Sequence, residues 1–353
     1  MIDHVVGRVY FIAKTQSGSR FVQEKLSDKQ YFDMFFNELR NHVGELMIDN
    51  FGHYAIEALF THCNDGQKIT LVTNLSRDIC NVACHKQGSF SIQAMMDTLT
   101  TPQQIKFLID ALNKDIKKII LNHSGHYVIL RFLQRYDYPY SKFIHRALMQ
   151  YTLDLSTDHY GLRVMKASVD AAHSQTQNGH TNVIKEMSAV FASIVKHANT
   201  LVENQYGNYI IQHLLDLGPK SITDTIKEKM HGKFVRYSKQ KFSSNVVEKC
   251  LRHSSQEMKE GNATKDWRRI IIKELLTKAG DLISDKYGNY CLQTALNSCI
   301  YDGQLLQEFH DSTKPHLDTL RENVKAKWIK LLDNAIDKSK TLNNSSINII
   351  KNN

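Results

Sequence analysis

The chain has 353 residues, of which 42% are hydrophobic, with only 4 prolines and 16 glycines, so it can bury a core and is not a low-complexity chain. Its 45 Lys and Arg exceed its 36 Asp and Glu, and the net charge of +9 moderately favours a polyanionic partner. No uninterrupted apolar run is long enough to span a bilayer. The start lacks a signal-peptide pattern and the six cysteines form no disulfide framework, so we expect a cytoplasmic protein.

A short segment recurs along the chain. The clearest copies are Asn204–Gln212, Gln240–Glu248 and Asp285–Gln293. Aligned at one position, the copies stand at Ser19, His53, Ser89, His126, Leu162, Asn208, Ser244 and Asn289. The intervals are 34, 36, 37, 36, 46, 36 and 45 residues, so five of the seven lie close to one period. Such a period is typical of stacked helical repeats.

Each copy is predicted to be the second helix of a repeat. A turn precedes it, marked in seven copies by Gly18, Gly52, Gly88, Gly125, Gly161, Gly207 and Gly288, and in one by Ser243. We expect these glycines to adopt positive φ between two helices. The two long intervals contain polar stretches, 173–182 and 256–264, which we interpret as inserted loops. Strand patterns are missing, so the sequence predicts an all-α solenoid.

The C-terminal part follows the last copy. Residues 303–338 are amphipathic and include Trp328, so we expect capping helices there. The polar tail 341–353 is predicted to be disordered. Residues 1–340 then form one repeat domain.

Within each second helix, residue i and residue i+4 lie one turn apart on the same face, and residue i+1 lies beside them. The pairs at i and i+4 are Ser19/Gln23, His53/Glu57, Ser89/Gln93, His126/Leu130, Leu162/Lys166, Asn208/Gln212, Ser244/Glu248 and Asn289/Gln293. The residues at i+1 are Arg20, Tyr54, Phe90, Tyr127, Arg163, Tyr209, Asn245 and Tyr290. Six pairs offer two hydrogen-bonding groups, and nearly all i+1 side chains are flat.

This arrangement is suited to single-stranded RNA, whose unstacked bases are held between planar side chains and hydrogen-bonded along their edges. A single helix with a Tyr and a Gln would be an ordinary surface helix. Here the pattern recurs in register while the surrounding sequence varies, and packing alone does not require that. We therefore take these positions as candidate RNA-binding residues.

The chain resembles the Pumilio homology domain of the PUF family over essentially its whole length. The motifs that carry the resemblance are Ser19-Arg20-x-x-Gln23, Asn208-Tyr209-x-x-Gln212, Ser244-Asn245-x-x-Glu248 and Asn289-Tyr290-x-x-Gln293. The resemblance implies a right-handed crescent of about eight three-helix repeats, with RNA antiparallel to the protein on the concave face. It also implies that Asn with Gln reads uracil, Ser with Glu guanine, and Ser or Cys with Gln adenine. The C-terminal repeats would then read 5′-UGU.

The middle of the chain departs from this pattern. Leu162 and Lys166 replace the usual Cys and Gln, and Leu130 adds no second hydrogen-bonding group beside His126. Ser19/Gln23 and Ser89/Gln93 suit adenine, and His53/Glu57 is an unusual pair that suits a purine. These departures fit flipped-out bases, phosphate contacts through Lys166 and Arg163, or a shorter motif read by fewer repeats. The resemblance offers divergent fungal members of the family, which bind short U/A-rich elements, as the comparison for the last of these.

The leading hypothesis is sequence-specific binding to mRNA 3′ untranslated regions. By resemblance, the protein would repress translation or promote decay through a deadenylase complex or translational repressors on the convex face. One alternative is a protein-binding scaffold of the armadillo or HEAT type, and another is sequence-independent nucleic-acid binding. No catalytic constellation or phosphate-binding loop stands out, so we expect no enzyme, metal, cofactor, small-molecule substrate or membrane.

Overall fold

The computed structural model describes residues 4–179 and 182–351, with side chains up to Leu342, and within this part of the chain no β-strand occurs. The predicted all-α class is therefore confirmed. The chain divides into two compact units, Met1–Ser193 and Ile194–Asn353. No helix in the described residues is both long and apolar enough to cross a membrane.

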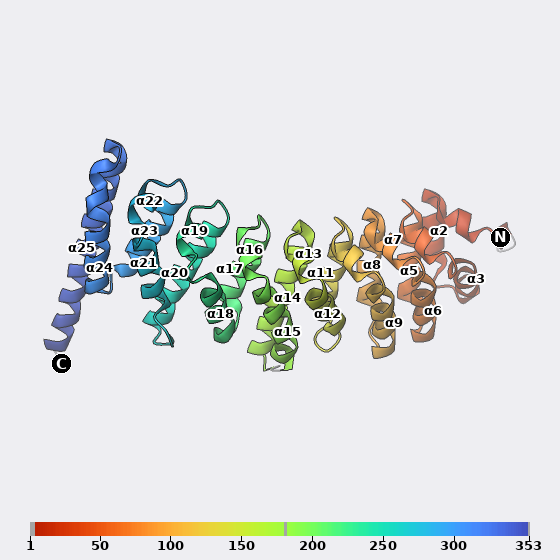
Figure 1. The fold of residues 1–353 in the computed structure, drawn as a ribbon. Helices are drawn as coiled ribbons and strands as arrows, with labels where there is room; N and C mark the ends of the chain where they lie inside the picture. Colours follow the sequence, from red (N-terminus) through yellow and green to blue (C-terminus); the bar gives the residue numbers. More distant parts are fainter. Residues whose placement is uncertain (1–3, 180–181, 352–353) are drawn as a thin grey trace. The chain divides into compact units, whose positions relative to one another are not determined.

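The first unit contains five consecutive helix triplets, which we number as repeats 1 to 5 (Figure 1). They are α1 (Val9–Ala13), α2 (Gln16–Lys25) and α3 (Lys29–Leu39); α4 (Val43–Met47), α5 (Gly52–His62) and α6 (Asp65–Leu75); α7 (Ile79–Cys84), α8 (Lys86–Thr98) and α9 (Pro102–Asn113); α10 (Ile116–Ile120), α11 (Gly125–Arg135) and α12 (Lys142–Gln150); and α13 (Thr152–Ser156), α14 (His159–Gln177) and α15 (Asn182–Lys196). The last residues of α15 belong to the second unit.

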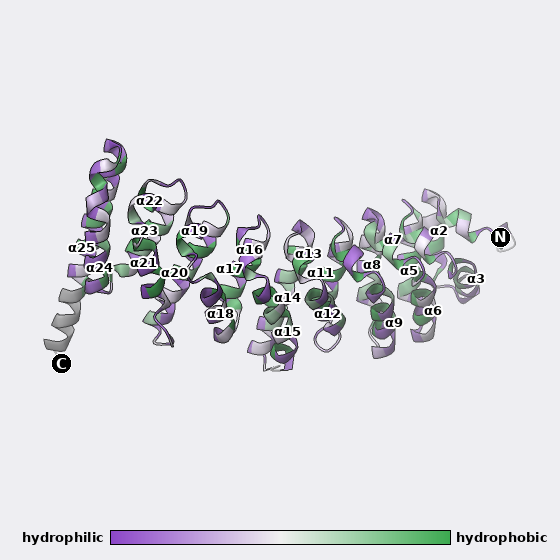
Figure 2. Cartoon of the chain, in the orientation of Figure 1, coloured by the Kyte–Doolittle hydropathy of each residue, from purple (hydrophilic) through white to green (hydrophobic). Residues whose placement is uncertain are grey.

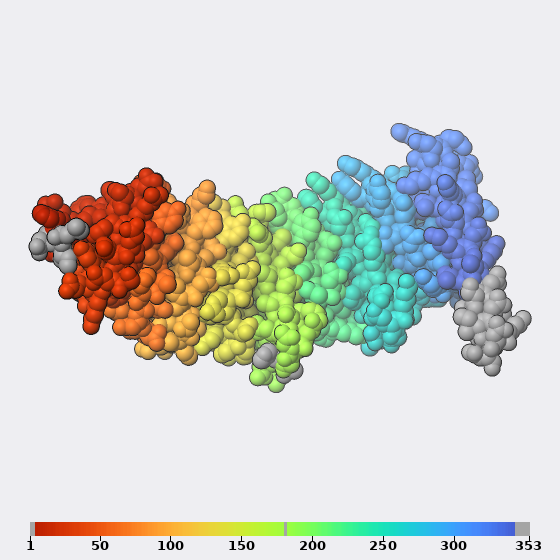
Figure 3. All heavy atoms as spheres, turned by 180° about the vertical axis from the view of Figure 1, so that it is seen from behind, coloured from red at the N-terminus to blue at the C-terminus, as the bar shows by residue number. Residues whose placement is uncertain are grey.

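The second unit contains repeats 6 to 8 and a C-terminal segment. The repeats are α16 (Ala198–Glu203), α17 (Gly207–Leu217) and α18 (Lys220–Met230); α19 (Phe234–Ser238), α20 (Ser243–Lys259) and α21 (Trp267–Leu276); and α22 (Ala279–Ser284), α23 (Gly288–Cys299) and α24 (Gly303–Thr313). The 3₁₀-helix η2 (Lys314–Thr319) and α25 (Glu322–Lys351) follow. The residues of each repeat form one band of colour in the space-filling view (Figure 3).

Each second helix is amphipathic and packs its apolar stripe inside its repeat. In α17 the buried residues Ile210, Ile211, Leu214 and Leu215 recur at the three- and four-residue steps of one helical face. Polar residues are interspersed with apolar ones along helices such as α20 (Figure 2). Burial of these stripes, at roughly 25 cal/mol per Å² of apolar surface, favours stacking of the repeats.

An Asp or Asn side chain begins the second helix in five of the repeats. The Asn204 Oδ1 accepts hydrogen bonds from the Tyr206 and Gly207 backbone N–H groups at 2.8 and 2.9 Å. Asp49, Asn122, Asp158 and Asp285 do the same in their repeats. These bonds satisfy N–H groups that lack partners inside the helix.

The glycines that precede the second helices do not have positive φ, so that expectation was wrong. The glycines with positive φ are Gly7, Gly179, Gly232 and Gly261. The helix-start glycines are needed for space instead, because a Cβ atom on Gly125 would lie 2.5 Å from the Ile119 carbonyl oxygen. In repeat 7 a serine replaces the glycine, and the hydroxyl Ser243 Oγ donates to the corresponding carbonyl oxygen, that of Tyr237, at 2.8 Å.

The two polar insertions are shorter as loops than the sequence suggested. Within the stretch 173–182, residues 173–177 continue α14, which has 19 residues, and residues 256–259 continue α20, which has 17. The other second helices have 10 to 13 residues. Thr181, at the end of the first insertion, and His180 lie outside the described residues. The inserted residues therefore mainly lengthen two second helices.

The C-terminal segment begins later than the capping helices we expected at 303–338. Helix α24 completes the eighth triplet, and η2 and α25 follow it, with Trp328 of α25 only 1% exposed. The predicted disordered tail, 341–353, appears as a continuation of α25 as far as Lys351, while Asn352 and Asn353 lie outside the described residues. The disorder of this tail thus stays a prediction.

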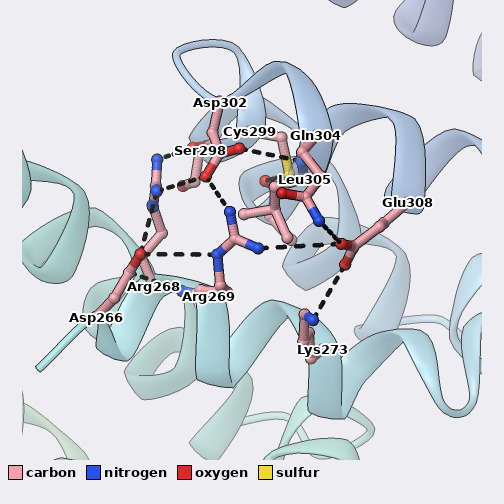
Figure 4. A network of polar contacts seen from close by, with 11 residues as sticks. Asp266, Arg268, Arg269, Lys273, Ser298, Cys299, Asp302, Gln304, Leu305 and Glu308 are labelled. Atoms are coloured by element: carbon pink, nitrogen blue, oxygen red, sulfur yellow. Dashed lines mark hydrogen bonds and ion pairs between the residues drawn. The ribbon is translucent and has the colours of Figure 1, made fainter.

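Two ion-pair networks join helices of the second unit. The Nη2 atoms of Arg268 and Arg269 on α21 donate to Asp302 Oδ2 at 3.0 and 2.8 Å, and Lys273 pairs with Glu308 of α24 at 3.4 Å (Figure 4). The second network is buried and connects α18 to α20. Its centre is Lys227, which is 0% exposed and donates to Glu257 Oε2 at 2.7 Å. Both networks fix neighbouring repeats against each other.

Candidate nucleic-acid interface

The side chains at i+1 of the second helices are exposed in all eight repeats. The aromatic rings among them are 44 to 59% exposed: Tyr54 51%, Phe90 59%, Tyr127 44%, Tyr209 54% and Tyr290 54%. Arg20, Arg163 and Asn245 are exposed as well. A Tyr or Phe placed for packing would be buried, so these rings are available to a ligand within each unit.

The amide pairs are ordered by a bond along their own helix. Gln212 Nε2 donates to Asn208 Oδ1 at 3.0 Å, and Gln293 Nε2 donates to Asn289 Oδ1 at 2.8 Å. Each Asn in turn donates from Nδ2 to a backbone carbonyl of the preceding turn at 2.8 Å. The same i to i+4 bond joins Gln23 to Ser19 and Gln93 to Ser89. In these four repeats the structure brings the predicted pair together with a fixed orientation.

The two carboxylate pairs are ordered differently. Glu248 does not bond to Ser244 but accepts from Thr294 Oγ1 of α23 at 2.9 Å and from Arg252 Nη2 at 2.6 Å, both at Oε2. Glu57 accepts from Ser91 Oγ of α8 at 2.7 Å. Each carboxylate is thus held by a hydroxyl group from the second helix of the next repeat.

A hollow of about 360 Å³ lies between α2 and α5 in the first unit. Its lining includes four of the predicted positions, Ser19, Arg20, Gln23 and Tyr54. One edge-reading pair and two flat side chains therefore surround the same space. That is the arrangement that holding one base between two planes requires.

In repeats 4 and 5, the last two of the first unit, side chains of the predicted site contact each other. The Arg163 guanidinium lies 5.1 Å from the centroid of the Tyr127 ring, and its Nη1 bonds to Tyr127 OH at 3.2 Å. The same nitrogen donates to His126 Nε2 at 3.0 Å, because His126 Nδ1 already donates to the Asn122 carbonyl oxygen. Burial lowers the pKa of His126, which favours this neutral form. Arg163 therefore covers one face of the Tyr127 ring.

The side chains at positions i and i+4 of repeats 4 and 5, where the predicted pairs would contact bases, offer few hydrogen-bonding groups. His126 is 0% exposed and Leu162 is 8% exposed, while Leu130 and Lys166 are half-buried. Lys166 is a donor only, and the two leucines have no polar side-chain atom. Repeats 4 and 5 thus differ from the other six in geometry as well as in sequence.

The sequence did not predict three side chains of the site: Ser91, Thr294 and Arg252. They lie outside positions i, i+1 and i+4, and only their contacts with Glu57 and Glu248 reveal them. A polar residue on an otherwise buried helical stripe, such as Ser91 at 0% exposure, was the available signal. In the described part of the chain no group of three or more His, Cys, Asp or Glu is placed to hold a metal ion.

Comparison with known proteins gives a family match. The model of the Pumilio-family RNA binding repeat matches residues 8–39, 42–76, 78–112, 197–231, 233–260 and 279–302, together more than half of the chain. These stretches coincide with repeats 1 to 3 and 6 to 8.

Curated relatives agree with this match. Pumilio homolog 12 of Arabidopsis thaliana is 31% identical over 325 residues, covering 90% of this chain and 51% of the relative. The Pumilio domain-containing protein C6G9.14 of Schizosaccharomyces pombe is 29% identical, covering 81% and 40%. The chain thus spans about half the length of these relatives.

Solved structures show the same fold. The RNA-binding domain of yeast Puf5p bound to AAT2 RNA superposes with a TM-score of 0.77 at 24% identity, covering 94% of this chain and 97% of that one. The Puf4 RNA binding domain bound to an HO endonuclease 3′ UTR recognition sequence gives 0.73 at 23% identity, covering 93% and 99%.

Proposed function

The chain belongs to the Pumilio family of RNA-binding repeat proteins, and on this premise we propose that it binds single-stranded mRNA sequence-specifically within 3′ untranslated regions. Two solved structures support this proposal, the Puf4 domain bound to a 3′ UTR recognition sequence and the Puf5p domain bound to AAT2 RNA. The proposed consequence is repression or decay of the bound mRNA in the cytoplasm, through a deadenylase complex or translational repressors. As a binding module it needs no catalytic group, in line with the expectation that it is not an enzyme.

The observation that carries the proposal is the ordered set of three pairs in the second unit. Asn289/Gln293, Ser244/Glu248 and Asn208/Gln212 lie beside the exposed side chains Tyr290, Asn245 and Tyr209. Guanine presents adjacent N–H donors on its Watson–Crick edge, which a carboxylate can accept, whereas the amide pairs offer both donors and acceptors to uracil. We therefore propose that repeats 8, 7 and 6 read 5′-UGU.

An exchange of the middle pair tests this reading. The double substitution Ser244→Asn with Glu248→Gln converts the guanine-type pair into a uracil-type pair. We expect the preference at the second base to change from guanine to uracil, measured by fluorescence anisotropy with UGU and UUU RNAs. Glu228→Gln, an exposed carboxylate of α18, is the matched control and should leave both affinities unchanged. Unchanged preference for UGU in the double variant would contradict the assignment.

A shorter U/A-rich element is the second candidate, and the contacts within repeats 4 and 5 favour it. Arg163 on Tyr127, together with the apolar Leu130 and Leu162, leaves repeats 4 and 5 poorly equipped to read bases. A random-library RNA selection separates the two candidates, because it counts the positions that carry preference. Equal affinity for scrambled RNA would instead indicate sequence-independent binding, and no RNA binding would indicate a protein scaffold.

A further inference from the structure

We propose that repeat 2 selects a guanine outside UGU through His53 and Glu57, and that Ser91 of repeat 3 is a positioning residue for this reading. The inference rests on the proposed RNA-binding function. It names the base at a repeat for which the sequence pair, His53/Glu57, indicated only a purine. It depends on three features: the tautomer of His53, the anchoring of Glu57, and the chemistry of the guanine edge.

His53 presents an acceptor to the site. Its Nδ1 lies 2.9 Å from the Asp49 carbonyl oxygen, and since a carbonyl can only accept, Nδ1 carries the hydrogen. In the neutral ring Nε2 then has a free lone pair. His126 of repeat 4 shows the same arrangement, with Nδ1 on the Asn122 carbonyl oxygen at 3.0 Å and Nε2 accepting from Arg163 Nη1 at 3.0 Å. An N–H donor from a base would approach His53 as Arg163 approaches His126.

Glu57 adds further acceptors in a fixed orientation. Ser91 Oγ is 2.7 Å from Glu57 Oε1 and 3.3 Å from its other acceptor, the Met47 carbonyl oxygen. A hydroxyl has one hydrogen, and the shorter contact shows that Glu57 receives it. Ser91 is fully buried, so its hydroxyl cannot move far, and the carboxylate is held at the face of α5.

The pair is therefore composed of acceptors only. Among the four bases, guanine alone presents two adjacent N–H donors on its Watson–Crick edge, whereas adenine, cytosine and uracil each place an acceptor next to a donor. Any base but guanine would direct a lone pair at Glu57 or at His53 Nε2, and unpaired acceptors are costly when partly desolvated. The exposed ring of Tyr54 lies beside His53, with ring centroids 3.8 Å apart, and Phe90 at position i+1 of repeat 3 is exposed as well.

Repeat 7 supports the role of Ser91. Glu248, proposed to read the guanine of UGU, is held by Thr294 Oγ1 from the second helix of repeat 8 at 2.9 Å. Both reading carboxylates thus depend on a hydroxyl from the next repeat, whereas each reading glutamine at i+4 bonds to residue i of its own helix. A carboxylate only accepts, and the donors of Ser244 and His53 are directed at backbone carbonyls of the preceding turn, so each carboxylate is anchored by a hydroxyl of the next repeat instead.

A selection experiment tests the proposal. The whole chain is incubated with an RNA pool in which UGU is followed by a randomised stretch, and bound RNAs are sequenced. Four RNAs that differ only at the most enriched position are then compared by fluorescence anisotropy. We expect guanine at one position beyond UGU, binding at least about fivefold tighter than adenine, as a bidentate contact worth about 1 kcal/mol or more requires.

The variants assign that position to repeat 2. Glu57→Gln replaces an acceptor with a donor and should abolish the downstream guanine preference while leaving the guanine of UGU unchanged. Ser91→Ala should reduce the same preference without abolishing RNA binding, and Asp110→Asn, an exposed position of α9, should change neither. If circular dichroism shows that Glu57→Gln is not folded, the wild-type selection still tests the guanine preference and Ser91→Ala still tests its assignment to repeat 2.

The outcomes separate this inference from the proposed function. Enrichment of UGU with adenine, uracil or no preference downstream overturns the guanine assignment alone, as does a guanine preference that survives Glu57→Gln. An unchanged preference in Ser91→Ala overturns its positioning role. Failure to enrich UGU-containing RNA at all overturns the proposed function and this inference with it.

Discussion

Removing one exposed ring should weaken RNA binding without harming the fold. Tyr209 on α17 is 54% exposed, and its neighbours Ile210 and Ile211 are fully buried, so the backbone of this helix is fixed by the core and not by the ring. We therefore expect Tyr209→Ala to change the free energy of unfolding by no more than about 0.5 kcal/mol, as at other surface positions. The ring contributes to binding instead, through stacking on a base.

The size of the binding effect follows from the stacking energy. A base stacked on an aromatic side chain contributes about 1–3 kcal/mol, so the Kd for a UGU-containing RNA should rise by about 5- to 150-fold. Fluorescence anisotropy at constant salt measures this change. Tyr301→Ala is the matched control, because Tyr301 is 61% exposed in the same unit but lies outside the reading positions.

A double-mutant cycle locates the contact. If Tyr209 stacks on the third base of UGU, its removal should cost little when that base is replaced by an abasic site. A Kd that changes by less than about twofold on UGU RNA, or equally in Tyr301→Ala, would refute the stacking argument. An equal loss with normal and abasic RNA would show that the ring acts elsewhere.

Three further predictions concern stability. Gly125→Ala should lower the free energy of unfolding by about 1–3 kcal/mol in urea denaturation, because its Cβ would lie 2.5 Å from the Ile119 carbonyl oxygen. The control is Gly66→Ala in α6, where the added Cβ makes only an ordinary contact, so the substitution should be neutral or stabilising. Lys227→Met should cost about 3 kcal/mol, since the half-buried Glu257 loses the fully buried Lys227 but keeps Lys220 at 2.8 Å. A loss below that of an exposed lysine variant would contradict this. Burial lowers the pKa of His145 from 6.5 to about 4, so the unfolded chain binds the proton more tightly than the folded chain does. The free energy of unfolding should therefore fall by on the order of 3 kcal/mol as the pH drops from about 6.5 to about 4. In His145→Leu this part of the pH dependence should be missing from thermal melts.

The repeat architecture and the position of the planar side chains could be predicted from sequence because both depend on periodicity. The interval of about 36 residues locates the second helices, and the helical step of 100° places Tyr209 and Tyr290 on the face that the structure shows to be exposed. The glycines were interpreted wrongly for a physical reason. Positive φ and close packing both favour glycine, and only coordinates distinguish them.

The partners of the reading residues could not be predicted because they depend on packing between repeats. Ser91 and Glu57 are separated by 34 residues, and Thr294 and Glu248 by 46, so no local pattern joins them. Arg163 on Tyr127 is another example, because the sequence suggests a stacking side chain at each position but not that one would cover the other. Arg163 and Tyr127 belong to repeats 4 and 5, in each of which one residue of the reading pair is a leucine, Leu130 or Leu162.

The contact between Gly125 and the Ile119 carbonyl, repeated with other residues along the chain, has a consequence for engineering. Each glycine directly precedes the first reading residue. For Gly18, Gly88, Gly125, Gly161 and Gly207, a Cβ atom would lie 2.9 Å or less from a main-chain carbonyl oxygen of the preceding helix, so main-chain atoms set the spacing of the reading residue there. Reading residues can therefore be transplanted from one repeat to another without altering their frame. The exchange to make first is between repeats whose glycine lies against a main-chain carbonyl, such as 3 and 6, because repeat 7 has Ser243 at this position.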